Sequence, residues 1–216
     1  MATGGHAWRN ANLDVSETII PGLQNRFRLN GRVVFSDQFN NSMDDRGFNW
    51  GFVGGYQAWN DRWLLGLELN VGWDETNRNH FYAFEDTGNV ILANTDYDRN
   101  TVVGLSVRLG FDAWEYIMPY IRLGAERSRD KFELFATSGA GSINIEERRN
   151  QTRFVGGFGL EVPVLADVSF RVEYDYHSEG KELALAGTTS DGLTFISART
   201  NPTIHTVNAA VVLNFS

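Results

Sequence analysis

Apolar and polar residues alternate strictly along much of the chain. In the segment 63–73 every odd position holds Trp, Leu or Val, and the even positions after Leu64 hold Gly, Glu or Asn. A period of two is typical of β-strands, whose successive side chains point to opposite faces of a sheet. The pattern recurs in eight segments: 27–35, 50–58, 63–73, 101–111, 119–125, 152–162, 168–176 and 205–215. The sequence therefore predicts an all-β fold with eight strands.

The two faces of these strands differ in a way that indicates which one points outward. The apolar face carries no formal charge in any of the eight segments, and its aromatic residues lie near the segment ends. The opposite face mixes Gly with Arg and Glu, as a narrow polar lumen requires. An apolar exterior with aromatic girdles is typical of transmembrane β-barrels. We therefore predict an antiparallel, up-and-down transmembrane barrel. A soluble, lipocalin-like barrel is the alternative.

The connections between the segments alternate in length. Three of them, 60–62, 112–116 and 163–167, are short, whereas 36–47, 74–100, 127–151 and 178–202 are longer and polar. Membrane barrels have short periplasmic turns and long extracellular loops. Three long loops also contain short β-prone runs around turn residues, so we expect hairpins in Phe81–Leu92, Phe132–Ile145 and Leu183–Ile196. Their apolar residues should pack together or mark an interaction surface, and their edges should be able to accept a partner strand.

Composition narrows the class of protein. The chain has 216 residues, no Cys, and 19 Lys and Arg against 27 Asp and Glu, which gives a formal net charge of −8. The absence of Cys excludes disulfides and thiolate metal sites, and the acidic balance argues against general nucleic-acid binding. We assign residues 25–216 to the barrel and residues 1–24 to an N-terminal tail. The tail lies in the periplasm, enters the lumen or adds to the wall.

Charged residues on the polar face are expected to form a network inside the barrel. An eight-stranded barrel is only wide enough for its own side chains to fill it, so Arg and carboxylates should pair there. We interpret this network as a structural plug; a gated polar path is the alternative. The network candidates are Arg28, Arg32, Glu68, Arg108, Arg122, Glu126, Glu161, Arg171 and Glu173.

The loops suggest two further sites. Five basic residues follow the point where the strands of the third long loop leave the membrane. They either contact the phosphates of lipopolysaccharide or serve general loop solubility. They are Arg127, Arg129, Lys131, Arg148 and Arg149. Ser178 and His205, with Glu179 or Glu182, suggest a lipid hydrolase, but such pairs are commonplace at loop bases and we assign no catalytic residue. The segment Asp96–Asn100 lacks the Gly and Glu of an EF-hand, so we expect neither a metal nor a cofactor.

The C-terminal segment Val207–Phe215, the segment Trp50–Trp73 and the run Pro119–Gly124 together resemble the small eight-stranded outer-membrane barrels of bacteria. These are the OmpA transmembrane domain, the OmpX/Ail proteins and the Opa-like surface antigens. The resemblance implies that Val207, Val211, Leu213 and Phe215 form the assembly signal, although Ser216 follows the terminal aromatic. It also implies export with a signal peptide absent from this chain, periplasmic chaperones, and insertion by the barrel-assembly machinery.

These observations lead to three functional hypotheses. We expect a monomeric, non-enzymatic surface protein of the outer membrane, whose extracellular hairpins mediate adhesion or contact with a host or the envelope. Its other partners are then the membrane lipid and lipopolysaccharide. A narrow pore for ions or small solutes is the first alternative, and a lipid-modifying hydrolase is the second.

Overall fold

The computed structural model describes residues 1–19, 41–75, 79–86, 89–114, 116–138, 141–188, 190 and 194–214. These residues form eleven strands and no helix. The strands are β1 (Ala2–Ile19), β2 (Asn41–Asn60), β3 (Trp63–Glu75), β4 (Asn79–Asp86), β5 (Asn89–Phe111), β6 (Met118–Ser138), β7 (Gly141–Leu165), β8 (Val168–His177), β9 (Leu183–Thr188), β10 (Thr194–Thr200) and β11 (Thr203–Leu213). Within the described part of the chain, no helix is long and apolar enough to cross a membrane.

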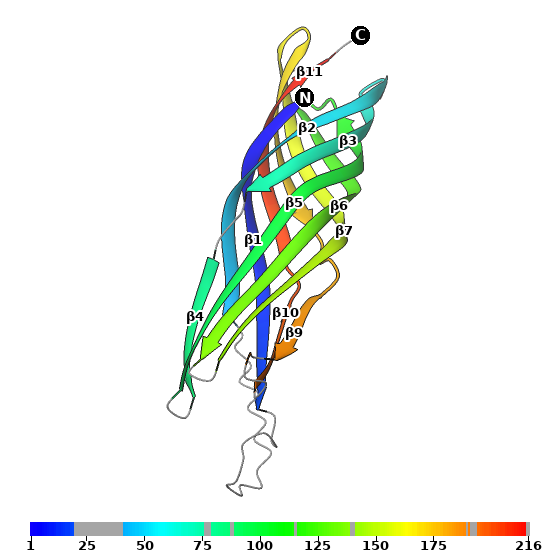
Figure 1. Cartoon of the computed structure of the whole chain (residues 1–216). Coiled ribbons are helices and arrows are strands. Elements are labelled where there is room, and N and C mark those ends of the chain that lie inside the picture. The colour runs from blue at the N-terminus through cyan, green and yellow to red at the C-terminus, as the bar shows by residue number, and fades with distance from the viewer. Residues whose placement is uncertain are drawn as a thin grey trace, which may run out of the picture.

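Eight of the described strands close into a ring. The order around it is β11-β8-β7-β6-β5-β3-β2-β1, and β1 pairs with β11 to complete the circle. Every pair is antiparallel. Both chain ends lie at the end of the barrel that carries the short turns (Figure 1). The eight-stranded antiparallel barrel predicted from the sequence is therefore confirmed.

The first wall strand differs from the one expected at 27–35, which lies outside the described residues. The position between β2 and β11 is held by β1, with Ala2 opposite both Phe52 and Val211. Residues 2–19, which the sequence assigned to an N-terminal tail, thus form part of the barrel wall and not a segment in the periplasm or the lumen. The alternation of apolar and polar residues did not reveal this strand, because its outward positions include Gly4 and His6 and not a run of large apolar residues.

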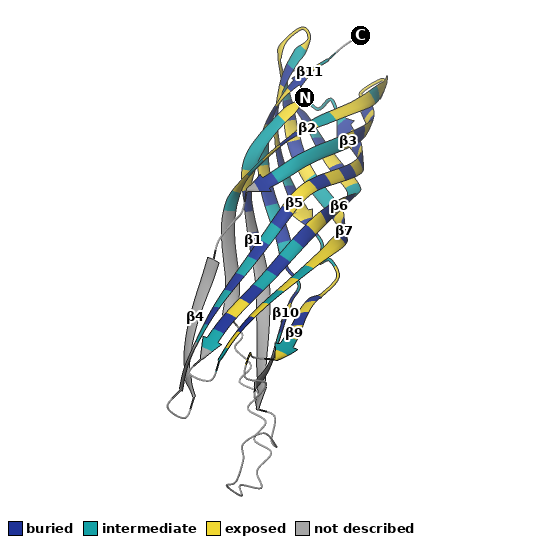
Figure 2. Ribbon diagram, viewed as in Figure 1, coloured by how far each residue is buried: buried dark blue, intermediate teal, exposed yellow. Residues whose placement is uncertain are grey.

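Burial alternates along the wall as the sequence predicts (Figure 2). On β3 the exposed fractions of Leu65, Leu67 and Leu69 are 56%, 52% and 53%, whereas Glu68 on the opposite face is 7% exposed. The exposed apolar face is bounded by aromatic pairs at two heights. Trp50 stacks on Trp73 at the level of the long loops. Trp63 contacts Phe111 near the short turns.

Beyond the upper aromatic level the barrel continues as two four-stranded sheets. One sheet has the order β4-β5-β6-β7 and is formed by β4 with the upper parts of β5, β6 and β7. The other has the order β2-β1-β10-β9, because the upper part of β1 pairs with β2 on one side and with β10 on the other. The three expected hairpins are confirmed as β4–β5, β6–β7 and β9–β10. We call this part the extracellular extension.

The extracellular extension has its own apolar core. Phe132, Leu134 and Leu183 are fully buried, and Leu185 is 2% exposed. The apolar side chains expected in the hairpins thus pack against each other where they are described. The side chain of Phe195 is not among those described. The remaining members of the core are Ala93, Tyr97, Ala136, Ile143 and Ala198, with Ile145 packed against them.

Candidate functional site

The lumen contains paired charges in successive levels, and the level nearest the short turns joins two arginines to two glutamates. Arg171 contacts Glu68 at 3.0 Å and Glu161 at 3.1 Å. Arg108 bonds to Glu161 and lies 3.4 Å from Glu68. Both guanidinium groups also lie over the ring of Tyr120, at 5.0 and 5.2 Å from its centroid. Each carboxylate therefore has two cationic partners, which offsets the cost of its burial.

Arg122 on β6 is the centre of the next level. Its Nη1 donates to Glu173 at 2.8 Å and to Asp175 at 3.1 Å. Its Nε donates to the Ser106 hydroxyl at 2.9 Å, and its Nη2 donates to the Asn70 carbonyl oxygen at 3.3 Å. One guanidinium therefore holds two neighbouring carboxylates of β8 and ties them to β3 and β5.

The third level lies where β8 ends. Glu126 accepts a bond from Arg99 at 3.0 Å, and His177 Nδ1 lies 3.0 Å from the same carboxylate. Arg9 on β1 bonds to Asp74 at 2.9 Å. All five side chains are buried. Arg99 also lies 3.9 Å from Asp74, so a chain of ion pairs runs from Arg9 on β1 to Glu126 on β6.

The fourth level lies above the upper aromatic girdle, beneath the apolar core. Asp130 accepts bonds from Arg153 at 2.7 Å, from the Tyr97 hydroxyl at 2.5 Å and from Ser128 at 2.7 Å. Burial alone would raise the pKa of the Asp130 carboxyl, but the guanidinium groups of Arg153 and Arg99 and the hydrogen bonds to the carboxylate together hold that pKa below its usual range. Burial, together with the Asp130 carboxylate, raises the pKa of Tyr97, so its hydroxyl remains a donor.

Two cavities adjoin these levels. One cavity of about 80 Å³ adjoins Asn49, Glu173 and His177. A second, of about 330 Å³, lies nearer the short turns beside Gln57 and Arg171. The first has room for about two or three water molecules, taking about 30 Å³ each. The chemistry available to this lumen is the mutual neutralisation of buried charge.

The five basic loop residues do not share one surface. Arg127, Arg129, Lys131 and Arg148 lie on the outward face of β6 and β7, where Lys131 pairs with Arg148 in the strand register. We call these four residues the basic face. Arg149 has the inward parity of β7 and donates to the backbone oxygen of Glu182 at 2.9 Å, so it lies away from this face. Lys131 and Arg148 contact Glu146, whereas Arg127 and Arg129 make no ion pair with a described residue.

The comparisons with known proteins identify the family. The model of the outer membrane protein beta-barrel domain matches residues 22–215. This chain belongs to that family. Membership and the lipid-facing wall place the protein in the bacterial outer membrane. A search of curated proteins found no matching relative.

Several solved structures are similar to this outer-membrane barrel. Ail, the attachment invasion locus protein of Yersinia pestis, is 19% identical, with 95% of this chain and 97% of that chain covered and a TM-score of 0.34. OprG of Pseudomonas aeruginosa is 13% identical over 98% and 95%, with a TM-score of 0.42. The outer membrane protease OmpT of Escherichia coli is 8% identical over 98% and 96%, with a TM-score of 0.48.

The sequence located part of the lumen network of this barrel. Of the expected members, Arg28 and Arg32 lie outside the described residues, and the other seven are buried and contact oppositely charged partners. The prediction omitted Arg9, Arg99 and His177. Arg99 lies just beyond a register shift between Arg99 and Val102, which moves it from the outward to the inward parity. Arg9 belongs to the strand that the pattern did not show.

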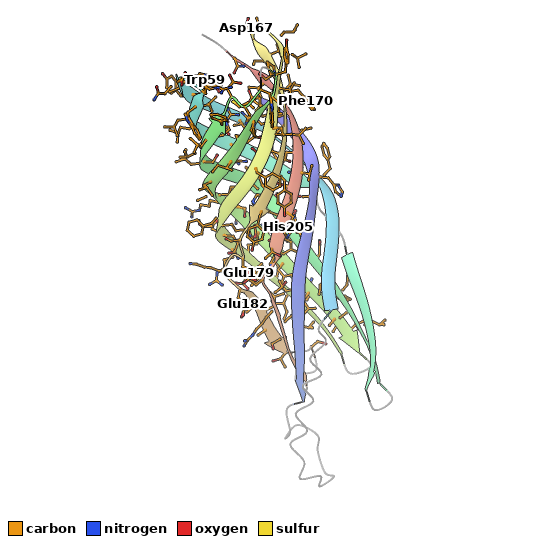
Figure 3. The ribbon with its side chains drawn as sticks, turned by 180° about the vertical axis from the view of Figure 1, so that it is seen from behind. Trp59, Asp167, Phe170, Glu179, Glu182 and His205 are labelled. Atoms are coloured by element: carbon orange, nitrogen blue, oxygen red, sulfur yellow. The ribbon has the colours of Figure 1, made fainter. Side chains whose placement is uncertain are left out.

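The hydrolase candidates Ser178 and His205 each bond to other residues. Ser178 accepts a bond from the Phe154 amide at 3.0 Å and donates to the Glu179 carbonyl at 3.3 Å. His205 bonds instead to the Tyr174 hydroxyl at 2.7 Å. Figure 3 shows His205 on β11 and Glu179 and Glu182 beyond it, towards the extension. Among the described residues, no group of three His, Asp or Glu is arranged to hold a metal.

The expected assembly signal lies on the lipid-facing side of β11 where it is described. Val207, Val211 and Leu213 are 39%, 50% and 53% exposed. Phe215 lies outside the described residues. The three described side chains thus form one apolar stripe on the last strand.

Proposed function

We propose that this protein is a non-enzymatic surface protein of the outer membrane, and that its extracellular extension mediates adhesion or contact with a host or the envelope. The single observation that carries this proposal is the buried core of the extension, in which Phe132, Leu134 and Leu183 are fully enclosed. A packed core holds an external surface in one shape, which a recognition surface requires. Unstructured loops would not provide such a surface.

The lumen supports the same proposal because it is ill suited to transport. Four levels of paired charges cross the described interior, and Arg108, Arg122 and Arg153 are each 5% exposed or less. Removing one partner of a buried pair costs about 3–5 kcal/mol. An ion in transit would have to break such pairs, so the structural plug is favoured over the narrow pore.

The basic face gives the protein a second contact, with lipopolysaccharide. Arg127 and Arg129 are exposed on the strand that carries the lipid-facing Leu123. They therefore lie at the height of the outer-leaflet headgroups, where anionic phosphates attract cations. The expected test is that Arg127→Gln with Arg129→Gln weakens capture of lipopolysaccharide micelles by the purified barrel. Arg199→Gln, a change of another exposed arginine, should not; equal capture by all forms would contradict the contact.

Assembly is proposed to follow the usual route of the family. Val207, Val211 and Leu213 present the apolar stripe that the barrel-assembly machinery receives after chaperoned passage through the periplasm. The folded protein then acts as a monomer, because the described ring closes within one chain.

The proposed function is tested by removing the hairpins. Phe81–Leu92, Phe132–Ile145 and Leu183–Ile196 are replaced by short turns, and binding of purified protein to cultured cells and to serum proteins is measured. We expect a barrel that still folds but no longer binds, whereas Ser178→Ala binds normally. Retained binding without the hairpins, or loss of a lipid-hydrolysing activity in Ser178→Ala, would contradict the proposal.

A further inference from the structure

The wall of the extracellular extension has a seam between β7 and β9. Over residues 155–165, β7 pairs with β8, but among the described residues its upper part pairs only with β6. β9 pairs only with β10. The facing edges of β7 and β9 therefore lie side by side without a backbone ladder. We call this boundary the seam.

Side chains hold the seam closed at its lower end. The fully buried Gln151 accepts a bond from the Lys181 amide at 2.6 Å and donates to the Lys181 carbonyl at 2.7 Å. A side-chain amide here makes the two bonds that a backbone peptide would make in a ladder. The cause is the excursion Ser178–Glu182 between β8 and β9, which carries the chain away from its neighbour.

The closure is weaker in the middle of the seam. Glu147 accepts a bond from the Ala184 amide at 3.0 Å, and Arg149 donates to the Glu182 carbonyl at 2.9 Å. These two side chains are 28% and 46% exposed. At the top, Ser142 and Ser190 exchange two bonds of 3.0 and 3.2 Å.

Between these hydrogen-bonded points, the edge of β7 has backbone N–H and C=O groups that pair with no described strand. The backbone groups of Ser142 and Phe154 face the seam, and in an antiparallel ladder every second residue faces the same side. The register with β6 is unbroken over this stretch, so Asn144, Arg148 and Asn150 face the seam as well. No described backbone group bonds to them there. An unpaired edge of this kind is a template for an added strand.

We propose that the seam is a binding site for an extended peptide strand, which pairs with the edge of β7 after β9 swings aside. The strand runs antiparallel to β7 and continues the sheet β4-β5-β6-β7. The strand takes the place of Leu183 and Leu185 of β9 in the apolar core, so its inward face carries apolar residues beside Ile145. Its outward face carries polar residues of mixed charge beside Glu146 and Arg148. This inference rests on the proposed function, because it names the class of partner that the extension accepts.

The site is tested by locking the seam. The chain contains no Cys, so an engineered pair is unambiguous. A Cβ atom at Gly187 would lie 3.4 Å from Ile145 Cγ1, and Cys at both positions is therefore close enough to bridge the seam. The control pair is Phe135→Cys with Asn144→Cys, which links β6 and β7 where a ladder already joins them.

The probe is a fluorescent peptide that copies residues 130–138, a strand that pairs with β7 on its other side. Its inward positions include Phe132, Leu134 and Ala136, and its outward positions are polar except Phe135. We expect the wild type and the oxidised control to bind it. The oxidised Ile145→Cys, Gly187→Cys protein should bind at least tenfold more weakly and recover on reduction. A scrambled peptide of the same composition should not bind.

Three outcomes would overturn the proposal. They are equal binding by the locked and reduced seam, no binding by the wild type, and self-association of the wild type that the lock abolishes, because the occupant would then be a second copy. The two proposals can fail separately. If removal of the hairpins abolishes cell binding but the locked form still binds the peptide, the peptide site at the seam is refuted and the proposed function is not.

Discussion

Replacing Arg122 by Met is expected to destabilise the barrel strongly. Met keeps most of the side-chain volume but removes the guanidinium that bonds to Glu173, Asp175, Ser106 and Asn70. Glu173 then keeps the Tyr120 hydroxyl at 2.8 Å, and Asp175 keeps a 3.4 Å bond from Asn208, but both carboxylates lose the bonds from Arg122. Leaving buried carboxylates without their cation costs about 3–5 kcal/mol.

The matched control is Arg127→Met, five residues away on the same strand but exposed. An exposed charge without a buried partner contributes about 0–1 kcal/mol, so this variant should unfold at nearly the wild-type urea concentration. Unfolding in detergent is followed by tryptophan fluorescence. Adding Glu173→Gln and Asp175→Asn to Arg122→Met should restore most of the lost stability, because the unpaired charges are then gone. If Arg122→Met costs no more than Arg127→Met, the network does not hold the barrel together.

Three further predictions follow from the wall, the lumen and the extension. Leu67→Arg places a charge on the lipid-facing surface at a cost of about 2–4 kcal/mol. The yield of folded, heat-modifiable protein should therefore fall well below that of the lumen variant Asn70→Ser. Equal yields would mean that the lipid-facing and lumen-facing sides have been assigned the wrong way round. Planar-bilayer recordings should show no steady conductance of general-porin size, and large stable openings would favour the pore. The pKa of Asp130 is lower in the folded than in the unfolded protein, so its stabilising effect is present above about pH 4 and is lost as the pH falls towards the folded value. Wild-type stability should therefore decline more than that of Asp130→Asn between about pH 6 and about pH 3; parallel curves would contradict this.

The parts of the fold that touch lipid were predictable from sequence. Lipid excludes charge from one face of a strand, so Leu65, Leu67 and Leu69 stand out against Glu68. Turn residues also revealed the three hairpins. Asp61 in the first short turn has a φ of 56°, a conformation that Asp tolerates better than most residues.

The parts that touch only protein were harder to predict. The described outward residues of β1, Ala2, Gly4 and His6, are small or polar, so no run of large apolar residues marks the strand, and Arg9 was missed with it. The register shift at Arg99 reverses the face of a residue without changing its neighbours in sequence. The seam depends on how far β9 is displaced from β7, and the local sequence of neither strand records that distance. Pairing partners within the lumen likewise follow from the closed ring and not from any one segment.

We propose that this protein acts through its extracellular extension and not through its lumen. The most direct measurement compares cell binding by bacteria that display the wild type, the barrel without the three hairpins, and the lumen variant Arg122→Met, Glu173→Gln, Asp175→Asn at equal surface amounts. We expect the lumen variant to bind as the wild type does and the barrel without hairpins to lose binding. Binding that survives loss of the hairpins but disappears in the lumen variant would contradict the proposal that the extracellular extension carries the function.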